Sequence, residues 1–171
     1  NILVTYDIAN PLKPVEVSRW WMPGQNAAGG EAPHPKGAEH RLHHAMRCGD
    51  QLYAGCWASG VAIIDIKDIS KPRTLSHYEY EPAFPEPTHT FLKVPFPIAG
   101  RSIALSTEEE RPNRGPDADK PHAPLRTWDV TDPTKPKLLY TFELPDDASP
   151  YHGRKYRFGA HQLREIVDPD C

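Results

Sequence analysis

Each of three short apolar segments begins with a histidine: His44 in "LHHA", His89 in "PTHT" and His161 in "GAHQ". Neutral imidazole nitrogens are common ligands of transition metals. Three imidazoles at equivalent places in repeated units are expected to converge, which predicts a mononuclear site for a transition metal ion (Fe, Cu, Zn, Ni or Mn). The sequence does not choose among these metals. Since the chain has nine histidines among 171 residues, a buried polar ring or an anion site without metal is the alternative.

Two glutamates are the candidate catalytic groups. Glu108 and Glu109 begin the polar, proline-rich segment "TEEERPNRGPDADKPHAP" (residues 107–124), which we expect to lie over the histidines. A carboxylate there would accept an imidazole N–H or act as a general base, and Glu108 is the better placed because it is nearer the strand end. A solvated acidic loop is the alternative. His122, in the same segment, is a candidate for the substrate pocket or for a further ligand.

Trp57 and His43 lie beside the predicted site. Trp57, in "GCWASG", occupies the connection of the middle unit that corresponds to the glutamate segment, so we expect it to form a wall of a substrate pocket. Packing between units is the alternative for Trp57. His43 competes with His44, but adjacent strand residues point to opposite faces, and the alignment with "THT" and "AHQ" favours His44.

The segments that must position these residues repeat along the chain. Three stretches share the pattern D-[IV]-x-[DN]-x-x-K-P: "DIANPLKPVEV" (7–17), "DIKDISKPRTL" (65–75) and "DVTDPTKPKLL" (129–139). Each lies between two strand-like runs, where Asp can make a local hydrogen bond and Pro ends the strand pairing. The repeated aspartates are therefore interpreted as structural, and the recurrence itself indicates a repeat architecture.

Between these copies, alternating and β-branched runs predict four antiparallel strands per unit. The expected strands are 43–48, 51–58, 61–66 and 73–80 in the middle unit and 89–96, 101–107, 125–130 and 136–144 in the next, preceded by 2–8 and 15–21 and followed by 160–167. Repeated four-stranded units are typical of a β-propeller. We therefore expect a single, partial, all-β propeller domain of about three blades, with blade cores at about 1–21, 43–81, 88–145 and 158–171 and inserted loops at 22–42 and 107–124.

The segment "GVAIIDIKDISKPRTLSHYEY" (60–80) resembles the LVIVD-repeat β-propeller proteins of bacteria, whose unit is an aliphatic strand ending in a "VDISDPxxP"-like turn. The resemblance covers the three repeat cores, implies a propeller, and implies no particular activity. The insertions 22–42 and 107–124 depart from it, and the first, with His34 and His40, is expected to be a flap over the histidine face or else a plain loop. Since a propeller needs at least about four blades, we expect either a fragment of a longer protein or a ring completed by a second chain, such as a homo-oligomer.

Composition narrows the class of protein. Twenty prolines in 171 residues exclude an all-helical fold, and a net charge of −3 does not suggest a nucleic-acid partner. No apolar run has the length of a membrane-spanning helix. The chain begins without Met or a leader segment, which suggests a processed chain or a piece of a longer one. Three cysteines do not make a disulfide framework, and a tight turn at 49–50 would place Cys48 and Cys56 apart.

These observations favour a metal-dependent β-propeller enzyme with a histidine-ligated centre on the propeller axis. It would act on a small organic molecule by an oxidative, lytic or hydrolytic reaction. The alternative is a non-catalytic LVIVD-repeat propeller that serves as a binding or scaffolding module. No nucleophile elbow, phosphate-binding glycine loop or C-x-x-C pair points to another chemistry, and neither the substrate nor the compartment is indicated.

Overall fold

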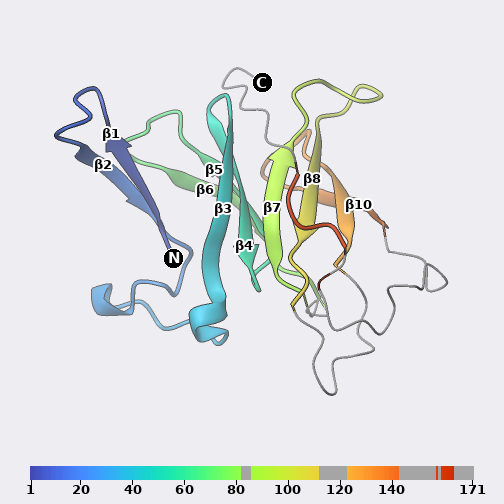
Figure 1. Cartoon of the computed structure of the whole chain (residues 1–171), viewed down its shortest axis with the longest axis horizontal. Helices are drawn as coiled ribbons and strands as arrows, with labels where there is room; N and C mark the ends of the chain where they lie inside the picture. Colours follow the sequence, from blue (N-terminus) through green and yellow to red (C-terminus); the bar gives the residue numbers. More distant parts are fainter. Residues whose placement is uncertain (82–85, 112–122, 143–156, 158, 164–171) are drawn as a thin grey trace.

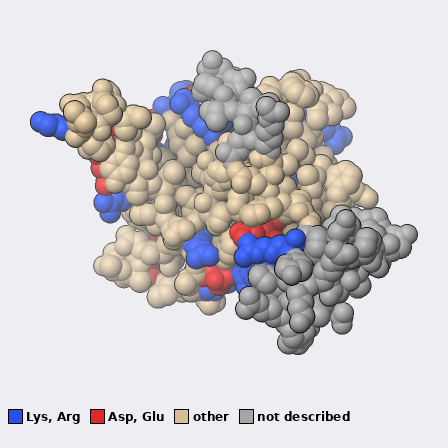
Figure 2. Space-filling model, viewed as in Figure 1, with Lys and Arg blue, Asp and Glu red and all other residues tan. Residues whose placement is uncertain are grey.

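The computed structural model describes residues 1–81, 86–111, 123–142, 157 and 159–163. Within them the chain is all β, apart from two single-turn 3-10 helices, η1 (Ala27–Gly29) and η2 (Gly37–Glu39). No helix among these residues has the length and apolar character needed to cross a membrane. Figure 2 shows acidic and basic side chains scattered and mixed over one face, in keeping with the small net charge of −3.

The strands form one pair and two four-stranded antiparallel units. Strands β1 (Leu3–Asp7) and β2 (Val15–Trp20) form the pair. The middle unit consists of β3 (His40–Cys48), β4 (Gln51–Trp57), β5 (Val61–Asp65) and β6 (Arg73–Tyr78), each paired with the next. The following unit consists of β7 (Thr88–Lys93), β8 (Ile103–Glu108), β9 (Leu125–Asp129) and β10 (Lys137–Phe142), joined in the same order.

Among the described residues, one strand pairing joins the two four-stranded units. Only Trp57 of β4 and Thr88 of β7 are paired across the junction, and the combined sheet curls into a half-barrel (Figure 1). The prediction of an all-β, antiparallel fold is thus confirmed. Several expected boundaries differ: β3 begins at His40, inside the expected insertion 22–42, β7 ends at Lys93 and not at 96, and residues 160–163 do not form the expected strand. Residues 164–167 of that strand lie outside the described part of the chain.

The repeated motif forms the same turn in all three copies. In the middle copy, Oδ1 of Asp65 accepts the backbone N–H of Lys67 at 2.9 Å, and Oδ1 of Asp68 accepts that of Ser70 at 3.1 Å. The equivalent bonds join Asp7 to Ala9, Asn10 to Leu12, Asp129 to Thr131 and Asp132 to Thr134. These hydrogen bonds confirm the structural interpretation of the repeated aspartates.

Two apolar layers hold the units together. Strand β5 is buried on both faces, which explains its uninterrupted apolar run. Ala62 and Ile64 pack with Trp20 and Met22 from the β1–β2 side. Val61 and Ile63 pack on the other side in a layer completed by Tyr53, Phe91, Ala104 and Trp128. The units are therefore stacked face to face around shared cores.

The cysteines differ from one another. Cys56 is a free, buried thiol, whereas Cys48 is disulfide-bonded. The prediction that these two are not partners is confirmed. The disulfide itself was not expected from the sequence, because an odd number of widely spaced cysteines gives no pairing pattern.

Candidate metal centre

The first strand of each four-stranded unit contains a β-bulge beside a histidine. In β3, His40 pairs with Trp57 and His44 with Gly55, so residues 41–43 face the single residue Cys56. In β7, Thr88 pairs with Glu108 and Thr90 with Thr107, so His89 is the extra residue. Bulges interrupt the alternation of side chains and redirect them. The two irregularities bring His43 and His89 to the same side of the junction.

Four imidazoles gather there, and we name His43, His44, His89 and His161 the histidine group. The ring of His89 is central: its centroid lies 4.3 Å from that of His43, 5.8 Å from that of His44 and 4.4 Å from that of His161. Nδ1 of His89 lies 2.7 Å from the hydroxyl of Thr90, which fixes the ring and leaves Nε2 for a ligand. The structure thus brings the three sequence-predicted histidines together and adds His43.

Glu109 supplies a carboxylate to this group. Its Oε2 lies 3.9 Å from Nε2 of His43 and 3.9 Å from Nε2 of His161. Ligand atoms of His43, His89 and Glu109 all lie within 4.8 Å of one another. Two ligands bound to one metal at about 2.1 Å each are about 3–4 Å apart. A small inward movement of these side chains would therefore give the spacing of a metal-ligand set.

Backbone contacts hold the group in place. The amide of Glu109 donates to the carbonyl of Pro87 at 2.7 Å, and the hydroxyl of Thr107 donates to the carbonyl of His161 at 2.7 Å. The other carboxylate oxygen of Glu109 accepts from Arg157 at 2.5 Å. The end of β8 therefore positions both the glutamate and the segment that carries His161.

The electrostatics favour neutral imidazoles. Burial, followed by the neighbouring His43 and His161 rings, lowers the pKa of His89 from 6.5 to about 4. Burial also lowers the pKa of His43, although Glu109 opposes the shift. Because only neutral imidazole binds a metal, both side chains are in the ligating form at neutral pH.

Trp57 lies against the histidine group. Its indole stacks on the ring of His43 with the centroids 4.7 Å apart and the planes 18° from parallel. Its backbone has φ of 51°, a left-handed conformation that is uncommon for a bulky residue. The indole N–H donates to Glu39 at 2.9 Å, which fixes the ring. Strained backbone of this kind concentrates at functional sites, and the role of Trp57 as a pocket wall stays a prediction.

Glu108 has different surroundings from Glu109. Its side chain is fully buried, and its Oε1 accepts from the hydroxyl of Tyr80 at 3.0 Å and from Arg126. Burial raises the pKa of this carboxyl from 4.5 to about 7, although Arg126 opposes the shift. Among the described residues, its hydrogen bonds thus go into the layer between the units and not to an imidazole. His122 lies outside the described residues.

A second cluster, which the sequence reasoning did not identify, joins the insertion 22–42 to the residue that follows β6. It contains His34, His40 and Glu79. Nε2 of His40 lies 3.0 Å from the carbonyl of Pro23 and must donate to it, so its Nδ1 accepts from Ser59 at 2.6 Å. Both nitrogens of His40 are thereby used.

Glu79 in this cluster is also committed, since it accepts from Lys36 at 2.6 Å. These bonds explain the cluster as a polar contact that attaches the insertion to the sheet. The presence of two histidines in the insertion was the only sequence signal for it.

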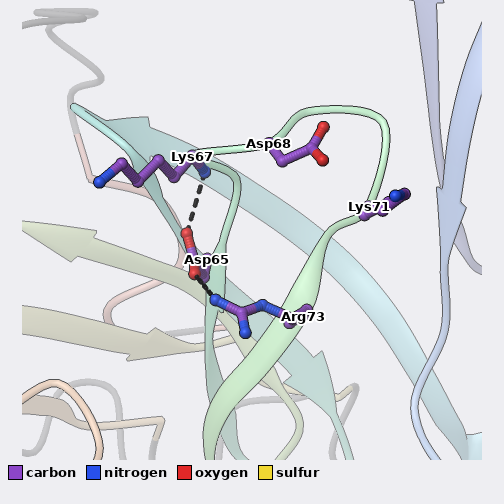
Figure 3. Close-up of a pocket in the computed structure, with 5 residues that line it drawn as sticks. All are labelled: Asp65, Lys67, Asp68, Lys71 and Arg73. Atoms are coloured by element: carbon purple, nitrogen blue, oxygen red, sulfur yellow. Dashed lines mark hydrogen bonds and ion pairs between the residues drawn. The ribbon is translucent and has the colours of Figure 1, made fainter.

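The repeat turn of the middle unit encloses a hollow of about 300 Å³, lined by Asp65, Lys67, Asp68, Lys71 and Arg73 (Figure 3). Asp65 is occupied: it accepts the backbone N–H of Lys67 and a guanidinium N–H of Arg73 at 2.6 Å. The hydrogen bond from the Lys67 backbone, with that from Arg73, lowers the pKa of Asp65. The hollow lies at the end of the sheet opposite to the histidine group and is accounted for by the turn.

A comparison with models of protein families found no match to this chain, and a comparison with curated proteins found none either.

Proposed function

We propose that the chain forms part of a β-propeller in which β1–β2, β3–β6 and β7–β10 belong to successive blades. Support comes from the consecutive antiparallel order of the strands and from the face-to-face layers between units. The resemblance of the repeat cores to LVIVD-repeat proteins points the same way. A ring of at least about four blades needs further strands, from additional sequence or from a second copy of the chain.

The proposed activity is that of a metal-dependent enzyme acting on a small organic molecule. The observation that carries it is the meeting of neutral His43 and His89 with the carboxylate of Glu109, with His161 beside them. His89, His161 and His43, or His44 in its place, would hold Fe, Cu, Zn, Ni or Mn. A metal bound there would act as a Lewis acid or activate water or oxygen. Glu109 would complete the ligand set or accept a proton.

A binding or scaffolding module is the second candidate. Strand β10 favours it, because Leu138, Leu139, Tyr140 and Phe142 are exposed large apolar residues on one short strand. Such a surface is typical of a contact with another chain. In this alternative the histidine group would be a polar ring without metal.

Elemental analysis of the untagged, as-purified protein tests the proposal. We expect about one equivalent of a transition metal in the wild type, loss of that metal in His89→Ala, and its retention in His34→Ala. The two variants are matched, since each removes one imidazole from one of the two histidine clusters. Circular dichroism establishes that both are folded. A folded wild-type protein that holds no metal after reconstitution, or equal metal loss in both variants, would contradict the proposal.

A further inference from the structure

Arg41 is a partly buried cation without a carboxylate partner among the described residues. The other arginines around the site are paired: Arg111 with Glu39, Arg126 with Glu108 and Arg157 with Glu109. Arg41 forms no such ion pair within the described chain, and its Nε is buried without a hydrogen-bond partner there. A buried N–H of a charged group that lacks an acceptor costs free energy. An acceptor supplied from outside the chain would remove that cost.

The position of Arg41 connects it to the histidine group. Its guanidinium carbon lies 4.6 Å from the centroid of the Trp57 ring, and Trp57 stacks on His43. The ring attracts the positive charge but does not accept the in-plane N–H groups. Because Glu39 holds the indole N–H, the platform under the guanidinium is fixed. Arg41 is therefore oriented while its donors remain unused.

The charges near Arg41 indicate the kind of anion that fits. Glu109 and Glu39 are each paired with another arginine. Arg41 thus offers one uncompensated positive charge in a planar fork that matches a carboxylate. A phosphate dianion would leave one negative charge unpaired.

There is also space beside Arg41. The residue lines an open hollow of about 440 Å³ together with Gln25, His34, Gly37 and His40. Hollows of roughly 300–1,000 Å³ accommodate small ligands. A small organic acid can therefore reach the guanidinium without displacing the sheet.

We propose that Arg41 binds the carboxylate of a small organic acid and that such acids are the substrate class of the histidine centre. The assignment of the acid as substrate rests on the proposed function, whereas the carboxylate site at Arg41 does not depend on it. Trp57 lies between the guanidinium of Arg41 and His43, so an acid held in the hollow beside Arg41 would have to extend past the Trp57 ring to reach the centre.

Nitrogen-15 NMR of the arginine Nε–H groups tests the site with acetate as the probe. The Arg41 signal is assigned from its absence in Arg41→Lys, and the Arg101 signal, from an arginine paired loosely with Asp129 at 3.7 Å, is the control. At constant ionic strength we expect acetate to shift the Arg41 signal in a saturable way, with at least about a tenfold weaker effect of the neutral isostere acetamide. The Arg101 signal should move little.

Three results would overturn the proposal. They are an Arg41 signal that moves with acetate no more than that of Arg101, an equal shift with chloride, or tighter binding of inorganic phosphate than of acetate. The titration is repeated on metal-free His89→Ala. If the wild type holds no metal and this variant still shows a saturable shift, the carboxylate site stands. The substrate assignment then fails together with the proposed function. Metal in the wild type without an acetate shift would remove the carboxylate site alone.

Discussion

His43 and His44 illustrate how a single strand irregularity changes a candidate ligand set. By strict alternation only one of two neighbouring residues can face the site. The bulge in β3 removes that restriction, and both rings approach His89, at 4.3 Å and 5.8 Å between centroids. Only His43 shares the close spacing with His89 and Glu109.

Replacing each of these histidines separately distinguishes their roles. We expect His43→Ala to weaken metal binding by about tenfold or more and His44→Ala by less than about threefold, because of these two residues it is His43 that shares close spacing with His89 and Glu109. Competition with a chelator measures both affinities. The opposite order would restore the assignment of His44 as the ligand.

The metal-free protein should lose stability as the pH falls from about 6.5 to about 4. Since the pKa of His89 is lowered to about 4, the unfolded chain binds a proton in this range before the folded chain does. The unfolding free energy therefore rises with pH across this window and is unaffected by this group below it. We expect the titration of His89 to change the free energy of unfolding by about 1–2 kcal/mol across this window. This is less than the full pKa difference would give, because water reaches one side of the site.

Denaturant titrations of the wild type and His89→Asn at several pH values measure this contribution as a difference. The variant should depend less steeply on pH between about 4 and 6.5. Equal slopes for the two proteins would show that His89 is protonated alike in the folded and unfolded states.

At the scale of the strands, Gly55 sets how closely β4 approaches β7. A β-carbon at Gly55 would lie 2.4 Å from the carbonyl oxygen of His89 and 2.8 Å from its carbonyl carbon. These are backbone atoms that cannot rotate away. The bulge that presents His89 therefore requires glycine on the neighbouring strand.

Gly55→Ala should destabilise the protein by about 2 kcal/mol and also weaken metal binding, because relief of the clash moves His89. Gly100→Ala is the control: its φ of +76° and open surroundings predict a loss of about 1 kcal/mol with unchanged metal affinity. Thermal unfolding and chelator competition measure the two effects. Intact metal affinity in folded Gly55→Ala would show that the approach of the strands does not set the site.

The strands could be predicted more closely than the site. Strand β5, expected at 61–66, spans Val61–Asp65, because its apolar run and flanking turn residues act locally. The bulges at His43 and His89 could not be predicted, since they depend on the register between strands. The contact of His40 with Ser59 and Pro23 likewise arises from tertiary packing of an insertion whose composition resembles that of an ordinary loop.

At the scale of the whole molecule, the outer strand β10 is the surface most in need of a partner. Its exposed Leu139, Tyr140 and Phe142 belong to a strand that, within the described part of the chain, is paired on one side, with β9. Unpaired apolar edges promote association between chains. Further strands or a second copy of the chain would cover this edge.

We expect the 171-residue chain to self-associate at concentrations of about 10 µM or more, and Tyr140→Lys to reduce the association at least about tenfold through a buried charge. Sedimentation velocity over a range of concentrations measures this. Leu12→Lys, at a highly exposed position in the first repeat turn, makes the same change in net charge away from β10 and is the control. A monomer at all concentrations would show that β10 needs no partner.

The two ends of the sheets differ in how well they should tolerate changes of sequence. At one end, each repeat turn is closed by its own hydrogen bonds, as at Asp65, and joins neighbouring strands of a unit, as between β5 and β6 (Figure 1). At the other end, where the histidine group lies, the connections leading into β3 and out of β8 are long. Substitutions and insertions in these connections could therefore change which ligand the site binds. The strands and the repeat turns would stay the same.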